Sequence, residues 1–187
     1  MFRRTGLLVA ALVVAAGFGS VSAASAEPVS SSASASAPYC GIRWGSQEKT
    51  AVTSPATPRV LTIIRAGRHD CYDRLVFDIR GGNATWYDVN YVTTMKYSDG
   101  RVVPLRGGAK LMILMQASDY NHAGWTAYRY TNRNELVNVS GYPTIRQVAW
   151  ADSLRITTTV GVGVRARLPF RVFMLPGRLV IDVAHHW

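Results

Sequence analysis

Short apolar runs, separated by Gly, Pro or Asp, follow one another from residue 59 to residue 187. In "RLVFDIR" the side chains of Leu75, Phe77 and Ile79 alternate with Arg, Val and Asp, and a period of two residues is typical of a strand with one buried face. "KLMILMQ" (110–116) is apolar on both faces of such a strand, which indicates a central strand that is fully covered.

Eight segments share this composition, and none of them repeats its apolar residues with the 3.6-residue period of a helix. They are residues 59–67, 73–81, 86–92, 110–118, 144–153, 157–167, 169–175 and 178–185. Many short strands at near-regular spacing are typical of a β-sandwich or a β-barrel. We therefore predict an all-β fold and a single folded domain over residues 59–187.

Residues 1–26 have the pattern of a signal peptide. Arg3 and Arg4 precede an apolar stretch from Leu7 to Phe18, and Ala24-Ser25-Ala26 supplies small residues for cleavage near Ala26. The stretch is shorter than the about 20 residues that span a bilayer, and no later segment is long enough, so no transmembrane segment is expected. We predict a secreted protein, extracellular or associated with the cell wall. The paired arginines leave general secretory and twin-arginine export both open.

Residues 27–58 are rich in Ser, Ala and Pro, a composition with too little apolar surface to form a core. We predict a flexible segment with a short arm, "YCGIRW" (39–44), that contains Cys40. Outside the cytoplasm, an even pair of cysteines predicts a disulfide between Cys40 and Cys71 that closes a loop of about 30 residues. A metal site is not favoured, because only His69 lies nearby, and no cofactor is expected.

The formal net charge is +10, and removal of Arg3 and Arg4 with the signal peptide lowers it to +8. Such a charge favours encounters with polyanions. Nucleic acid is not an expected partner of an exported protein, which leaves wall polymers, phospholipid headgroups and acidic glycans. Almost all the cations are Arg, and a GC-rich coding bias would produce the same composition without any ligand.

Four arginines near the end of the sequence are the first candidate ligand-binding group. They are Arg165, Arg167, Arg171 and Arg178. A period of two places the first two on one strand face, and a Pro176-Gly177 turn would pair the strands of the other two. The planar guanidinium suits carboxylate and phosphate groups. The alternative is an ordinary solvated face with cross-strand partners such as Asp78 and Asp182.

The aromatic segment "DYNHAGWTAYRYTNRNE" (119–135) is the second candidate. It lacks alternation, which predicts a long surface loop, and such loops often contain binding groups. Its candidate contacts for a sugar are Trp125, Tyr128, Arg129 and Tyr130. Equally, the aromatic rings would fold down as a lid over the sheet edge.

The sequence predicts no catalytic residue. His69 and Cys71 lie in "GRHDCYD", where a turn and a disulfide are favoured over a Cys–His nucleophile. His185 and His186 are adjacent, so in a strand they would point to opposite faces and could not chelate one metal ion together. A small hydrolase whose carboxylates meet only in the folded chain stays open as an alternative.

Four stretches carry a further pattern: "RAGRHDCYDRLVFDI", "GYPTIRQVAW", "GVGVRARLPFRVF" and "RLVIDVAHHW". Together they resemble the AMIN-like domain of secreted actinobacterial proteins, which is similar to the AMIN domain that precedes the catalytic part of many cell-wall amidases. The resemblance covers residues 59–187 and implies a β-sandwich of two antiparallel sheets that binds the cell envelope. No hydrolase sequence follows residue 187, so we expect a non-catalytic module for peptidoglycan or an anionic wall polymer. An extracellular protein–protein interaction module or inhibitor is the alternative.

Overall fold

The computed structural model describes residues 38–52, 59–84, 86–121 and 123–187, all within the compact unit Ser36–Trp187. The predicted signal peptide, its cleavage site and residues 27–37 lie outside the described residues. Within the described ranges, no helix is long and apolar enough to cross a membrane.

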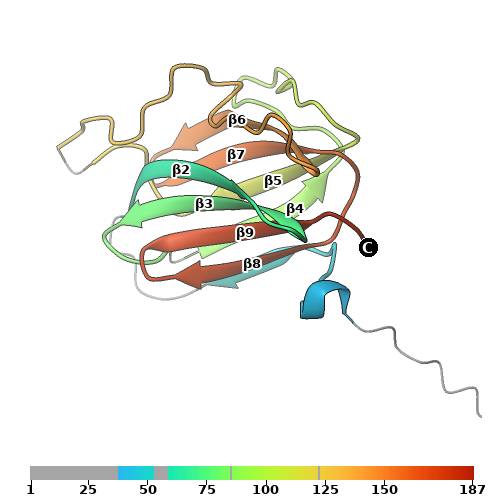
Figure 1. Ribbon diagram of the computed structural model, residues 1–187. Helices are drawn as coiled ribbons and strands as arrows, with labels where there is room; N and C mark the ends of the chain where they lie inside the picture. The colour runs from blue at the N-terminus through green and yellow to red at the C-terminus, as the bar shows by residue number, and fades with distance from the viewer. Residues whose placement is uncertain (1–37, 53–58, 85, 122) are drawn as a thin grey trace, which may run out of the picture. The chain divides into compact units, whose positions relative to one another are not determined.

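The described chain forms nine strands in two antiparallel sheets that pack face to face (Figure 1). The strands are β1 Lys49–Val52, β2 Val60–Arg68, β3 Tyr72–Arg80, β4 Trp86–Val92, β5 Ala109–Met115, β6 Ile145–Leu154, β7 Thr157–Val164, β8 Phe170–Leu175 and β9 Arg178–Ala184. One sheet has the order β1-β4-β5-β7-β6 and the other β2-β3-β9-β8. The prediction of an all-β sandwich of two antiparallel sheets in a single domain is confirmed.

Strand β1 differs from the prediction, because it lies within the segment expected to be flexible. Its residues pair with β4 from Lys49 opposite Val89 to Val52 opposite Trp86. The prediction was wrong here because an edge strand is held by backbone hydrogen bonds, which a polar sequence forms as well as an apolar one. Only Ala51 of this strand packs against the core.

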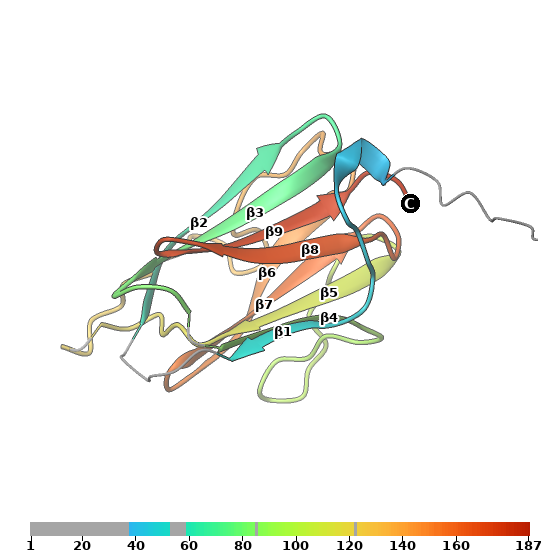
Figure 2. The same cartoon turned by 90° about the horizontal axis from the view of Figure 1, so that it is seen from below.

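The arm that contains Cys40 is attached to the domain in two ways. Cys40 forms the predicted disulfide with Cys71 and belongs to the 3-10 helix η1, Tyr39–Gly41. Farther on, Gly45 forms a β-bridge with Phe170 of β8. The arm then crosses from the β8 edge of one sheet to β1 in the other, as Figure 2 shows.

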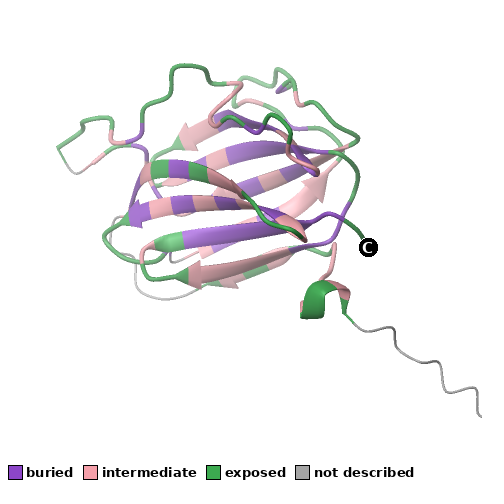
Figure 3. Cartoon of the chain, in the orientation of Figure 1, coloured by how far each residue is buried: buried purple, intermediate pink, exposed green. Residues whose placement is uncertain are grey.

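The core lies between the sheets and follows the predicted alternation. In β3, Leu75, Phe77 and Ile79 are buried while the residues between them are half-buried. Burial along the strands is coloured in Figure 3, where β9 is buried over almost its whole length. The inner face of β9 belongs to the core, and its outer face is covered by side chains of β3 and β8, as described below.

The two sheets differ in what covers their outer faces. The connection between β4 and β5 lies over the five-stranded sheet, where Met95 and Val103 form a second small apolar cluster with Ala149 and Ala151 of β6. Met112 of β5 packs against this cluster, which agrees with the prediction of a strand covered on both faces. The polar side chains of the four-stranded sheet therefore lie on the more open side of the sandwich.

A buried carboxylate joins the two sheets at one end. Asp73 of β3 is fully buried, and its Oδ2 accepts hydrogen bonds from the backbone N–H groups of Thr144 (2.7 Å) and Ile145 (2.9 Å). Its Oδ1 lies 3.1 Å from Nε2 of His185, whose Nδ1 lies 3.1 Å from the carbonyl oxygen of Asp70. Both ring nitrogens of His185 thus lie within hydrogen-bond distance of an oxygen atom, one on each side of the ring.

Substitution Asp73→Ala should therefore lower the free energy of unfolding by about 3–5 kcal/mol, because it leaves two buried N–H groups and the imidazole without their acceptor. Urea denaturation measures the loss. The control is Asp99→Ala, which removes an exposed ion pair with Arg101 and should cost much less than the loss of Asp73. Equal losses in the two variants would contradict the role of Asp73.

Two glycines of β7 allow the β4–β5 connection to lie directly on the five-stranded sheet. A Cβ atom on Gly163 would stand 2.0 Å from the carbonyl oxygen of Arg106, and one on Gly161 would touch Leu105 at 3.0 Å. Gln147 fixes the same segment, since its side chain accepts a hydrogen bond from the Arg106 N–H and donates one to the Pro104 carbonyl.

Substitution Gly163→Ala is expected to destabilise the fold by about 1–3 kcal/mol or more, because backbone must move to admit the methyl group. Gly67→Ala in β2 is the matched control: the nearest atom to its new Cβ, Nε2 of His69, is 3.8 Å away. This control should change stability by no more than about 0.5 kcal/mol. Thermal unfolding of both variants tests the difference, and a harmless Gly163→Ala would show that the close approach is unimportant.

Candidate functional site

The outer face of the four-stranded sheet gathers four arginines around two aspartates. The period of two places Arg74 opposite Asp182 and Asp182 opposite Arg171, in one row across β3, β9 and β8. Four residues farther along β3, Asp78 lies opposite Arg178. We call this surface the arginine face; its charged members are Arg65, Arg74, Asp78, Arg171, Arg178 and Asp182.

Asp182 is fully buried beneath two guanidinium groups. Arg74 donates from Nε to Oδ1 (2.6 Å) and from Nη2 to Oδ2 (2.9 Å), a bidentate pair. Arg171 donates from Nε to Oδ2 at 2.7 Å. The hydrogen bonds with Asp182 raise the pKa of Arg74, so this guanidinium is charged at every physiological pH.

Asp78 forms a similar but more exposed group. Arg65 donates from Nε to Oδ2 (2.7 Å) and from Nη2 to Oδ1 (2.8 Å), and Nε of Arg178 lies 3.3 Å from Oδ1. Hydrogen bonding to Asp78 also raises the pKa of Arg65. Each of the two aspartates thus neutralises one of its two arginines, which leaves the face with a surplus of positive charge.

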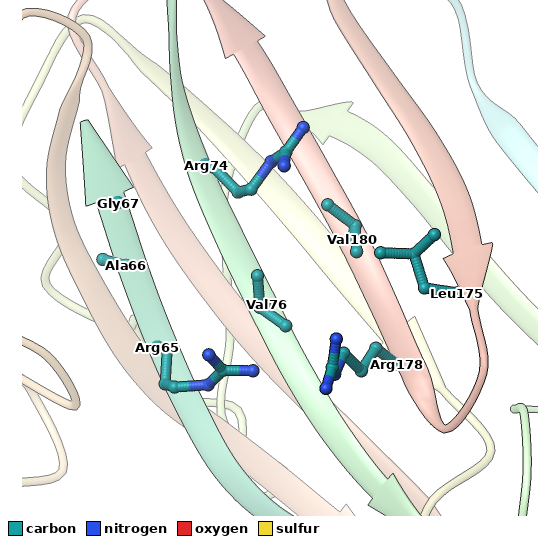
Figure 4. A pocket seen from close by; sticks show the side chains of 8 residues that line it. All are labelled: Arg65, Ala66, Gly67, Arg74, Val76, Leu175, Arg178 and Val180. Carbon is teal, nitrogen blue, oxygen red and sulfur yellow. The ribbon is translucent and has the colours of Figure 1, made fainter. Parts of the chain in front are cut away.

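Three of these arginines, Arg65, Arg74 and Arg178, line an apolar hollow of about 290 Å³. Figure 4 shows Arg65 and Arg178 pointing toward one another across Val76, with Arg74 farther along β3. Val180 and Leu175 complete the apolar floor. A shallow hollow of this kind suits a ligand with an anionic group at the rim and an apolar part against the sheet.

The structure brings together only two of the four arginines predicted to form the ligand-binding group. Arg171 and Arg178 belong to the arginine face, whereas β7 ends at Val164 and leaves Arg165 and Arg167 in the connection to β8. Arg165 donates to the carbonyl of His185 at 2.6 Å. Arg167 lies over the ring of Tyr91, 5.0 Å from its centroid. Here the chain crosses from one sheet to the other, which ends the alternation that the prediction relied on.

The predicted aromatic loop, residues 119–135, lies away from the arginine face. Some of its candidate residues cover the sheet edge as a lid, and others are exposed to solvent. Tyr128 is buried and stacks on Trp150 of β6 with centroids 5.4 Å apart, and Tyr130 lies 5.4 Å from the same ring. These two rings act as the lid. Arg129 is exposed, and Trp125 keeps 68% of its surface in solvent.

Burial raises the pKa of the Tyr128 phenol to about 12. Since an unfolded tyrosine has a pKa near 10, this phenol contributes stability that is complete below about pH 10 and is lost as the pH rises to about 12. Tyr128→Phe should remove one step near pH 12 from a titration of tyrosinate absorbance, and should flatten the loss of stability in that pH range. Tyr120→Phe, an exposed residue of the same loop, is the control and should leave the step in place.

Cys71 and His69, the residues considered for a nucleophile in the sequence analysis, both have structural contacts. Cys71 is in the disulfide, and His69 stacks on Tyr72 with centroids 4.5 Å apart. Burial, followed by the nearby Glu48 carboxylate, raises the pKa of Asp88 in β4. Among the described residues, no group of three or more His, Cys, Asp or Glu side chains is placed to hold a metal ion.

Sequence reasoning missed two of the four arginines of the arginine face. It also did not include the aromatic residues of the arm, Tyr39 and Trp44, among the candidate binding residues. Arg65 and Arg74 lie on the outer faces of β2 and β3, and the alternation that identified the core already placed Arg74 beside Asp78. Tyr39 and Trp44 of the arm, in contrast, lie in a polar segment with no periodic signal. The one signal in the sequence that these two aromatic residues are held against the domain was the cysteine that lies between them.

Comparison with known families agrees with this architecture. The sequence model of the AMIN-like domain matches residues 59–185. The chain belongs to the AMIN-like domain family. Comparisons with curated proteins and with solved structures found no match. In this AMIN-like domain the arginine face lies entirely within the matched residues, whereas η1 and Trp187 lie outside them.

Proposed function

We propose that this AMIN-like domain is a secreted, non-catalytic module that binds the cell envelope through its arginine face, with peptidoglycan or another anionic wall polymer as ligand. The observation that supports the proposal is the surplus of guanidinium groups over carboxylates around an apolar hollow on the open side of the sandwich. Membership of the family points to the cell wall as the source of the ligand.

The ion pairs leave donors available for a ligand. A guanidinium has five N–H donors, and Nε of Arg178 lies 3.3 Å from Oδ1 of Asp78. About half of the Arg178 and Arg65 side-chain surface is in solvent. A carboxylate or phosphate of a polymer can therefore bind their free edges while the aspartates hold the guanidiniums in position.

Location is consistent with this role. The disulfide between Cys40 and Cys71 fits an oxidising compartment outside the cytoplasm. Export itself rests on the predicted signal peptide of residues 1–26.

An extracellular protein-interaction module or inhibitor is the second candidate. It is favoured by the position of β2, which ends the order of the four-stranded sheet and exposes Ile63 to solvent. An exposed edge strand can accept a strand of another protein. Co-purification with one secreted protein, unaffected by added wall material, would support this candidate over wall binding.

Retention on purified peptidoglycan tests the main proposal. The double variant Arg171→Gln with Arg178→Gln should bind at least about tenfold more weakly, because two charge-assisted contacts are lost. Each aspartate keeps its second arginine, so the variant should stay folded. High salt should also release the unaltered protein, since about 1 M salt screens charges beyond about 3 Å.

The matched control is Arg101→Gln with Arg155→Gln, which removes the same charge from exposed sites away from the arginine face. If this control lost retention equally, net charge rather than the arginine face would explain binding. If the unaltered protein were not retained at low salt, wall binding would be rejected.

A further inference from the structure

A second concave surface lies beside the arm, and most of the residues that line it are outside the family match. It has a volume of about 630 Å³, about twice that of the hollow on the arginine face. Residues of the arm, of the β7–β8 connection and of the C-terminal segment line it, among them Tyr39, Ile42, Arg43, Trp44, Pro169 and Trp187. We call this surface the aromatic groove.

Several contacts fix the walls of the aromatic groove. The indole Nε1 of Trp44 donates to the carbonyl of Tyr39 at 2.8 Å, and Tyr39 packs edge-to-face against His186 with centroids 5.6 Å apart. The neighbouring Cys40 anchors the arm through its disulfide. The rings of Tyr39 and Trp44 are therefore held in place before any ligand arrives, which lowers the entropic cost of binding.

Trp187 is the exposed wall of the groove, with 72% of its surface in solvent. A large aromatic side chain gains free energy when a ligand covers it, since about 25 cal/mol is gained for each Å² of apolar surface removed from water. Trp125 is similarly exposed, but it lies on the aromatic loop and does not line this groove.

Charge restricts the kind of ligand. Among the described residues that line the groove, Arg43 is the one with a charged side chain, and none is Asp or Glu. Aromatic cages for cationic ligands use the negative faces of the rings, and a guanidinium at the wall would repel such a ligand. The groove thus suits a neutral or anionic molecule with flat apolar faces and polar edges, which is the chemistry of a pyranose ring.

The groove adjoins the arginine face through one contact. The guanidinium of Arg171 lies 5.6 Å from the ring centroid of Trp44 while it pairs with Asp182. A polymer that places a sugar ring against Trp44 would therefore bring its neighbouring anionic groups toward the arginines.

We propose that the aromatic groove binds a pyranose ring of a carboxylate-bearing polysaccharide, whose carboxylates pair with the arginine face. This inference rests on the proposed function and specifies its ligand as an acidic glycan rather than any polyanion. The arm and Trp187 supply the recognition of the sugar, and the arginine face supplies the recognition of charge.

Three probes separate these contributions. Oligogalacturonate has pyranose rings and carboxylates, its methyl ester has the rings without the charge, and poly-L-glutamate has the charge without the rings. Trp187→Ala should weaken the binding of oligogalacturonate and of its ester by about 5- to 30-fold, as expected for loss of an aromatic anchor. Binding of poly-L-glutamate should not change. Because Trp187 is exposed, the variant should have the thermal stability of the unaltered protein.

Trp125→Ala is the matched control, since it removes an equally exposed indole from another part of the surface. It should leave the affinity for all three probes unchanged, as measured by titration calorimetry. The double variant Arg171→Gln with Arg178→Gln should weaken oligogalacturonate and poly-L-glutamate alike.

Two failures have different meanings. If the unaltered protein bound poly-L-glutamate as well as oligogalacturonate, and Trp187→Ala changed neither, the aromatic groove would not be a sugar site and the arginine face would keep its proposed role. If the unaltered protein bound neither of these anionic probes, both the arginine face and the groove would be rejected as binding sites.

Discussion

In the centre of the four-stranded sheet, β3 and β9 pair so that Leu75 faces Ile181 and, one residue away, Arg74 faces Asp182. The first pair belongs to the core and the second to the arginine face. Because side chains alternate, a shift of one residue in this register would expose the apolar pair and bury the charged one. The same register therefore specifies both the stability of the sandwich and the position of its candidate ligand-binding surface.

The charges on the outer face follow from this arrangement. Asp182 is fully buried, and a buried carboxylate is costly unless it is paired and hydrogen-bonded. Here one arginine from each neighbouring strand covers it. Two cations for one anion satisfy the carboxylate and leave positive charge at the surface, so the structural requirement of Asp182 itself produces a cationic face.

The short apolar runs were sufficient to predict the strands β2–β9, because each of these strands buries at least one face in the core. This signal was insufficient for β1, whose polar residues are held mainly by backbone pairing with β4. Alternation also failed beyond Val164, where the chain passes between sheets and separates Arg165 and Arg167 from Arg171 and Arg178. A local pattern contains no information about such a crossing.

The aromatic groove was beyond sequence reasoning for a related reason. Tyr39 and Trp44 come close to Trp187 only because a disulfide and a β-bridge return the arm to the C-terminal end of the sandwich. These partners are separated by almost the whole length of the domain. No spacing along the chain relates them.

The disulfide also closes a covalent ring that runs through both sheets. Between Cys40 and Cys71 the chain passes through β1 in the five-stranded sheet and β2 in the four-stranded sheet. A single proteolytic nick anywhere between those two strands would therefore release no fragment. The arm and β1 would stay linked to the remainder until a reductant opened the bond.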